Sequence, residues 1–397
     1  MTMPPRDATL LAYPFRVFFV LTGLFAGASM LGWIAWLLGW GWLPSGVSPN
    51  LWHAHEMLFG FVPAAIAGFL LTAMTNWTGA PPLRGLSLLL LATLWLAARV
   101  AMWLADELPY GLAAGLDVVF LLVLAAYVGR ILYRAGQASR NGFLVAILAV
   151  LTAINLGMHL QLAGYGAGPA RLWAGLALDV IAVLMVVIGG RITPAFTANW
   201  LRMRGMDPGL VRRSTTLDWA AFVSTAALIP ADLIHGWPAV AGAVALLAAA
   251  VNGIRLGGWA GFRTIPEPLL WILHLGYAWI VVALALKGLA AFAGPAVGST
   301  WVHAMGAGAI GTLVLGVMTR VALGHTGRPL RLPRGAAVLY GLVTLAALVR
   351  IAVPWLPPEA YLPALLVSGL AWVAAFFGFT IVYWPILSRP RVDGRPG

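Results

Sequence analysis

The chain has 397 residues, of which 61% are hydrophobic and 9% are charged, and its formal net charge is +12. Long uncharged apolar runs of this kind are typical of a polytopic membrane protein. The sequence contains no cysteine, which excludes disulfides, iron–sulfur clusters and thiolate metal sites. Any metal must therefore be bound by imidazole, carboxylate, thioether or carbonyl groups.

The amino-terminal segment carries Arg6 and Asp7 before the first apolar run and has no small-residue cleavage site. This pattern predicts a retained cytoplasmic tail and not a cleaved signal peptide. The other arginines lie mainly in short loops between apolar runs, where positive charge sets the orientation of membrane helices. We therefore expect a lipid bilayer, and not a nucleic acid, to be the partner of this basic chain.

Apolar segments long enough to span a bilayer, at about 20 residues each, follow one another along the whole sequence. The fold class expected is all-α, a polytopic membrane protein with 12 transmembrane helices. These helices are predicted at residues 17–40, 53–75, 86–104, 111–133, 142–164, 170–190, 215–233, 238–256, 268–290, 300–323, 335–353 and 361–384.

The basic residues divide unequally between the two sides of these helices. Of the 24 Lys and Arg residues, all but four lie in the termini and the even-numbered loops, and the exceptions are Arg99, Arg171, Lys287 and Arg350. This asymmetry places both termini in the cytoplasm. We expect one integral membrane domain over residues 1–397, made of a tail (1–16), six helices (17–190), a basic cytoplasmic loop (191–214), six helices (215–384) and a second tail (385–397).

No repeat of one half of the chain in the other is evident. A weaker pattern recurs at every fourth helix, because the second, sixth and tenth helices end on their inner side in polar segments. These segments are residues 72–77, 191–194 and 318–320.

Histidines are costly to place in lipid and are common metal ligands, so their depth in the membrane is informative. The predicted orientation places four of them at the outer side of helices, with one more in an outer loop: His53, His55, His159, His303 and His235. A pair, His274 and His325, falls near the inner side. Since His303 and His325 are separated by ~33 Å along one helix, they cannot bind the same metal. The outer group suits copper with one haem ligand, and the inner pair suits a bis-histidine haem.

The segment that contains His53 and His55 allows two arrangements. In a continuous helix the two rings point about 200° apart and serve different centres, whereas a non-helical His53 could converge with His55 on one metal. The sequence leaves both open. Glu56 could orient a ligating imidazole or carry protons as a catalytic acid.

Each candidate also has a structural interpretation. His235 fits a polar anchor at the interface, His274 a hydrogen-bonded core histidine, and His325 a residue that ends a helix. Asp117 and Asp179 are weaker candidates that lie inside helices near the outer face. Arg320 could pair with a haem propionate or extend to the inner surface.

Several segments together resemble one family of bacterial membrane proteins. They are PFR (14–16), LWHAHEMLFGF (51–61), NWTG (76–79), GGRITPAFT (189–197), LHLGYAW (273–279), MTR (318–320) and GHTGR (324–328). On these motifs the chain resembles the NnrS family of haem- and copper-containing proteins. The resemblance implies a role in nitric oxide metabolism in the bacterial inner membrane, as a defence against nitrosative stress, with b-type haem and copper as cofactors.

These observations favour a protein that binds and reduces nitric oxide with electrons from a membrane quinol. In that hypothesis Glu56 donates protons, and the ligands of haem come from His55, His274 and His325. His53, His159 and His303 would bind copper or haem iron. The alternatives are a haem-based nitric oxide binder, sensor or assembly factor without turnover, and a transporter of copper, haem or a small solute. A transporter would favour inverted repeats and broken midplane helices, which the sequence does not show clearly.

Overall fold

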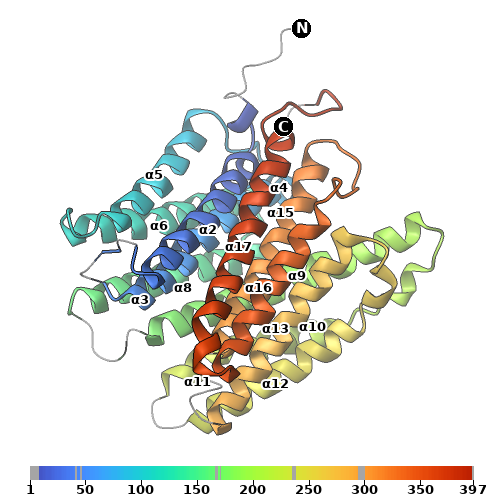
Figure 1. The fold of residues 1–397 in the computed structure, drawn as a ribbon. Helices are drawn as coiled ribbons and strands as arrows, with labels where there is room; N and C mark the ends of the chain where they lie inside the picture. Colours follow the sequence, from blue (N-terminus) through green and yellow to red (C-terminus); the bar gives the residue numbers. More distant parts are fainter. Residues whose placement is uncertain are drawn as a thin grey trace. The chain divides into compact units, whose positions relative to one another are not determined.

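The structure is a computed structural model, and it describes residues 9–40, 43–44, 47–165, 169, 171–234, 238–293 and 300–395. Most of these residues are helical, and no strand occurs among them (Figure 1). The α-helices are α2 (Pro14–Leu37), α3 (Pro49–His55), α4 (Val62–Thr78), α5 (Leu86–Trp103), α6 (Tyr110–Arg134), α7 (Ala138–Asn141), α8 (Phe143–Leu162), α9 (Arg171–Met203), α10 (Thr215–Ala226), α11 (Leu228–Leu233), α12 (Pro238–Gly257), α13 (Pro268–Ala293), α15 (Thr312–His325), α16 (Ala337–Ala352) and α17 (Pro358–Leu387). Two π-helices, η1 (Glu56–Phe61) and η4 (Ala304–Gly311), and three short 3₁₀ turns, η2 (Pro208–Leu210), η3 (Gly261–Thr264) and η5 (Val353–Trp355), complete the elements.

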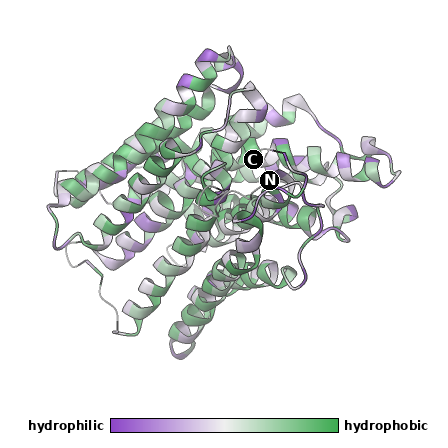
Figure 2. Ribbon diagram, turned by 90° about the horizontal axis from the view of Figure 1, so that it is seen from above, coloured by the Kyte–Doolittle hydropathy of each residue, from purple (hydrophilic) through white to green (hydrophobic). Residues whose placement is uncertain are grey.

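Eleven helical segments within the described residues are long and apolar enough to cross a bilayer. Figure 2 shows the hydrophobic colour along most of their length. These segments account for eleven of the predicted spans. The other predicted span, 215–233, forms two shorter helices, α10 and α11, which meet at Ala227. Pro230 contributes to this break, because it has no N–H to donate to the carbonyl four residues earlier.

The chain forms two compact units. The first unit contains residues 1–177, 318–331 and 376–397. Within it, α2 packs closely against α4, α5 packs against α6, and α6 packs against α8. Arg16 is fully buried, and its guanidinium donates to the carbonyl oxygens of Leu387 (2.6 Å) and Arg389 (2.9 Å) at the end of α17. Burial of this guanidinium is tolerated because backbone carbonyls at a helix end need donors.

The second unit contains residues 178–317 and 332–375. Here α13 packs against α12 and η4, and α10 packs against α12. A buried polar network surrounds Arg255, which donates to Val186 O (2.9 Å), the Tyr277 hydroxyl (2.8 Å) and Asp218 (2.7 Å). The Tyr277 hydroxyl in turn donates to Asn252 (2.5 Å). This network links α9, α10, α12 and α13 by bonds that are strong in a low-dielectric interior.

Both π-helices begin directly after a histidine. η1 follows His55, and η4 follows His303. In η1 the N–H of Val62 donates to Met57 O, five residues back, and Pro63 follows without an N–H of its own. The proline thus removes a bond that a regular α-helix would need at this point. Short π-helical turns of this kind occur frequently at functional sites.

The sequences of the segments that contain these two π-helices resemble each other, and they align without insertion or deletion. The matching pairs are His55 and His303, Met57 and Met305, Gly60 and Gly308, Gly68 and Gly316, Thr78 and Thr326, Gly79 and Gly327, and Pro81 and Pro329. Both segments also end alike, because each threonine hydroxyl donates to the carbonyl four residues back and each following glycine has φ near +70°. Left-handed glycine with proline just beyond is a common way to end a helix. The chain therefore contains one helix pattern twice.

Candidate metal centre

Three buried side chains from three different elements meet inside the first unit. His55 ends α3, Asp117 lies on α6, and His159 lies on α8. Nε2 of His55 and Nε2 of His159 are 3.2 Å apart, and Oδ2 of Asp117 lies 3.0 Å from each of them. All three residues are at most 2% exposed. They form the one group of three or more metal-ligating side chains found among the described residues.

The second nitrogen of each imidazole has a partner of its own. Nδ1 of His55 lies 2.8 Å from Oε1 of Glu56, and Nδ1 of His159 lies 2.9 Å from the Tyr110 hydroxyl. A carboxylate can only accept here, so His55 donates from Nδ1 and its Nε2 lone pair points at the cluster. Metal-ligating histidines are typically oriented in this way through the nitrogen that does not bind the metal.

Arg99 supplies the positive charge of the cluster. Its guanidinium donates to Oε1 of Glu56 (2.7 Å) and forms an ion pair with Asp117. Asn155 donates to Oδ2 of Asp117 (2.7 Å), so this carboxylate is held from several sides. With neutral imidazoles, the two carboxylates exceed the one guanidinium by one negative charge. A buried excess of negative charge favours the presence of a cation or a proton.

Gly60 makes room for this arginine. A Cβ at this position would lie 2.8 Å from the guanidinium of Arg99 and 2.5 Å from the Phe25 ring. The glycine carbonyl accepts from the Trp95 indole N–H (3.0 Å). The π-helix η1 thus places both Glu56 and Gly60 against Arg99.

The donor set fits a small metal ion. Bonds of about 2.0–2.1 Å in tetrahedral geometry separate neighbouring donor atoms by about 3.3 Å, which is close to the 3.0–3.2 Å observed here. The lone pair of His55 Nε2 faces the anionic oxygen of Asp117, and this contact is favourable only with a proton or a cation between the atoms. Two imidazoles and one carboxylate suit copper, zinc or iron.

Comparison with known proteins identifies the family of this chain. The family model described as NnrS protein matches residues 9–391, nearly the whole chain. The chain belongs to the NnrS family. None of the curated proteins compared with it matches significantly.

In this NnrS chain the neighbouring His53 faces away from the cluster. Both His53 and His55 lie in the helical turns of α3. Of the two predicted arrangements, the structure therefore shows the continuous helix and not the non-helical His53. The His53 ring stacks on Trp33, with ring centres 4.8 Å apart and planes at 24°. The two histidines therefore have different surroundings, as a spacing of two residues on a helix requires.

The predicted inner pair lies in two different units of the NnrS fold. In the second unit, His274 is mostly buried on α13, and its Nε2 lies 2.9 Å from the Thr197 hydroxyl. In the first unit, His325 ends α15 next to the rings of Tyr13 and Phe15. Arg320 is buried on the same helix, one turn or more before its end. A haem held jointly by the two histidines stays a prediction.

The other predicted residues lie elsewhere in the structure. His303 is the residue before η4 in the second unit. Asp179 is buried and accepts from Lys287 (2.5 Å), which also donates to Asp232 (2.8 Å). His235 lies outside the described residues.

Proposed function

We propose that this chain is an inner-membrane haem–copper protein of bacteria that binds nitric oxide and reduces it at the centre formed by His55, Asp117 and His159. Membership of the NnrS family supports the link to nitric oxide. The observation that carries the proposal is the buried donor set, in which each imidazole is oriented through its second nitrogen. Nitric oxide is small and apolar, so it can reach such a site from the lipid without a polar channel.

We assign copper to this centre. Histidine and carboxylate ligation without thiolate is compatible with copper in a redox protein. Bound copper would supply an electron and a coordination position for nitric oxide. The chain supplies His55 and His159 as ligands, Asp117 as an anionic ligand, and Glu56 and Tyr110 as the groups that orient the imidazoles.

Haem fits this centre less well. A porphyrin plane needs free space at the ligating nitrogen, but Nε2 of His55 lies 3.2 Å from His159 and 3.0 Å from Asp117. We therefore assign b-type haem to the histidines outside the cluster, with Arg320 as the partner of a propionate. These histidines are His274, His303 and His325.

Glu56 is the candidate for proton delivery. Reduction of two nitric oxide molecules to nitrous oxide and water consumes two electrons and two protons. Oε1 of Glu56 is bound by His55 and Arg99, whereas Oε2 is buried and has no hydrogen-bond partner within the described residues. This oxygen can hold a proton beside the site while the other orients His55. We propose a membrane quinol as the source of the electrons.

The first test combines an absorption spectrum, metal analysis and a nitric oxide electrode on the purified protein. We expect haem absorbance, copper, and consumption of nitric oxide after reduction with dithionite. Binding of nitric oxide without consumption would identify a binder or sensor instead of a reductase. Fully loaded protein that contains neither haem nor copper would refute the proposal.

A further inference from the structure

A second group of buried charges lies in the second unit, where α12 begins and α13 ends. The ammonium of Lys287 on α13 donates to Asp179 on α9 (2.5 Å) and to Asp232 on α11 (2.8 Å). Lys287 is 7% exposed and Asp179 is 1% exposed, whereas Asp232 is 18% exposed. The proposed reaction at the metal centre uses none of these residues.

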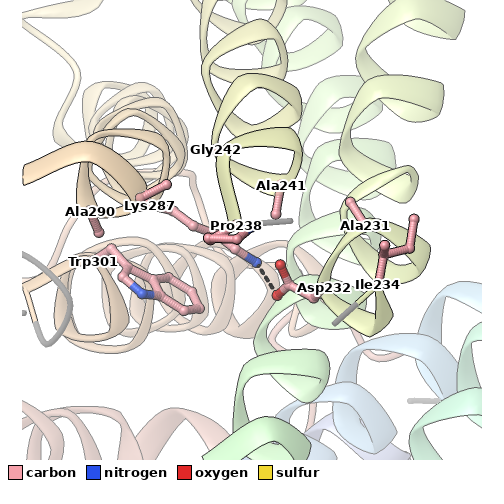
Figure 3. Close-up of a pocket in the computed structure, with 10 residues that line it drawn as sticks. Ala231, Asp232, Ile234, Pro238, Ala241, Gly242, Lys287, Ala290 and Trp301 are labelled. Carbon is pink, nitrogen blue, oxygen red and sulfur yellow. Dashed lines mark hydrogen bonds and ion pairs between the residues drawn. The ribbon is translucent and has the colours of Figure 1, made fainter. Parts of the chain in front are cut away.

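Two of these charged residues, Lys287 and Asp232, line a cavity of about 410 Å³ (Figure 3). Figure 3 shows the Lys287 side chain extended toward Asp232, with the indole of Trp301 close by. The Lys287 ammonium lies 4.7 Å from the centre of the Trp301 ring. The rest of the lining is small or apolar: Ala231, Ile234, Pro238, Ala241, Gly242, Ala290 and Ala291. A volume in the range of about 300–1,000 Å³ with few polar groups is usual for small-molecule sites.

The cavity fits a flat aromatic molecule that donates hydrogen bonds. The alanine and glycine residues of α12 and α13 in the lining carry no bulky side chain into the cavity, and the Trp301 indole can stack on an aromatic ring. The Lys287 ammonium is already bound by Asp179 on the side away from the lining, so the partly exposed Asp232 carboxylate is left to accept from a ligand with hydroxyl donors. Ile234, which lines the cavity, is 53% exposed, so an apolar tail could leave toward the lipid.

We propose that this cavity binds the headgroup of a membrane quinol, with Asp232 accepting a hydrogen bond from one quinol hydroxyl and Trp301 packing on the ring. The inference rests on the proposed function, which requires such an electron donor. Oxidation of the quinol to quinone releases two electrons and two protons. The electrons go to the oxidised haem or copper, one proton goes to the Asp232 carboxylate, and the other goes to water at the membrane surface.

Photolabelling tests binding without any enzymatic turnover. A short-tailed azidoquinone is reduced to its quinol, irradiated with the full-length protein in nanodiscs, and mapped by mass spectrometry. We expect label in residues 228–234, 238–242, 285–292 and 300–301, and competition by excess decylubiquinol. Ala290→Phe places an aromatic ring in the cavity and should abolish the label. Its control is Leu289→Phe, which adds an aromatic ring at the neighbouring, half-exposed position outside the lining.

A kinetic test addresses the carboxylate. Asp232→Asn should raise the KM for decylubiquinol in haem reduction about tenfold, since a hydrogen bond to a charged group is lost. Asp207→Asn is the control, because it removes one negative charge from an exposed turn while its side-chain oxygen can still accept from Gly209 N–H. Reduction by dithionite should be unaffected in all variants.

The outcomes separate this inference from the proposed function. Label elsewhere, or label and quinol kinetics that are unchanged in both Ala290→Phe and Asp232→Asn, would overturn the quinol site. If dithionite-reduced protein still consumes nitric oxide, the proposed function survives that result. Label at the predicted residues without any nitric oxide consumption would support the quinol site and contradict the reductase.

Discussion

Nε2 of His55 lies 3.2 Å from Nε2 of His159, and both nitrogens face the same carboxylate oxygen of Asp117. Two imidazole nitrogens at this distance need a proton or a metal ion between them. The hydrogen bond between His159 and Tyr110 distinguishes the two cases. When Nε2 of His159 binds a metal, its Nδ1 donates to the Tyr110 hydroxyl. When Nε2 carries the proton, Nδ1 accepts from that hydroxyl. The site can therefore exchange a proton for a metal ion with little movement of its side chains.

Removing a ligand should remove the metal from this centre. We expect His55→Ala, His159→Ala and Asp117→Asn each to lower the copper content of the purified protein strongly, as measured by elemental analysis. His53→Ala is the matched control, since its ring stacks on Trp33 and it is not one of the three grouped donors, and it should retain copper. Equal copper in His53→Ala and His55→Ala would contradict this assignment.

The groups that orient the imidazoles should tune the affinity of the metal. Glu56→Ala removes the acceptor of the His55 Nδ1 hydrogen bond and should weaken copper binding by about 10–100-fold. Glu56→Gln keeps an acceptor oxygen and should weaken it less. Tyr110→Phe tests the same relationship at His159. Competition against a copper chelator measures all three variants, and identical affinities for Glu56→Ala and the unmodified protein would argue against an orienting role.

Gly190 should be intolerant of a side chain. A Cβ there would collide with the Arg255 guanidinium, which holds the buried network of the second unit. We expect Gly190→Ala to destabilise the protein by about 1–3 kcal/mol, as overpacking of an interior does. Gly175 on the same helix has no heavy atom within 4 Å of its Cβ position, so Gly175→Ala should be neutral or stabilising by up to about 1 kcal/mol. Thermal unfolding in detergent compares the two, and equal shifts would show that the collision is relieved at no cost.

The ion pair between Arg391 and Asp393 in the carboxyl-terminal tail should break at low pH. The Arg391 guanidinium beside Asp393 holds the pKa of that carboxyl well below its usual range, and Arg391 also donates to His325 O (2.8 Å). Because the pKa is lower when Asp393 is paired with Arg391, the ion pair favours the ionised carboxyl. This stabilisation is fully present above the ordinary pKa of 3.8 and is lost as the pH falls through the lowered pKa.

A single spin label can follow this change, because the chain has no cysteine. Val392 is an exposed position of the tail. A label at Val392→Cys should become more mobile as the pH falls far enough below 3.8 to protonate Asp393. The same label in an Asp393→Asn background should show little dependence on pH. A strong pH response in both proteins would assign the change to another group.

The sequence predicted the helices and the ligand types better than it predicted the site. His55, His159, Glu56 and Asp117 were all candidates, because a costly polar residue inside an apolar helix needs an explanation. Charge asymmetry gives the depth of a residue but not its direction around the helix bundle. For this reason His53 could not be separated from His159 before the structure showed their surroundings.

Sequence reasoning missed both Arg99 and Tyr110 as residues of the site, although Arg99 left a signal. It is one of four basic residues outside the inner loops, and two of these four, Arg99 and Lys287, are buried among carboxylates. Two of the four exceptions to the predicted charge pattern therefore belong to internal ion pairs. The similarity between the second and the tenth predicted helices is also present in the sequence. A comparison of one half of the chain with the other half does not detect it, because the similarity covers a single helix in each half.

The π-helix after His55 has a consequence for insertions and deletions. One additional residue in a helix rotates everything before it by about 100° relative to everything after it. His55 is directed toward Asp117 and His159 in the register that η1 sets with α4. Deleting one residue between 56 and 61 while keeping every ligand would turn the imidazole away from its partners. The length of this short segment is therefore as much a part of the centre as the ligands themselves.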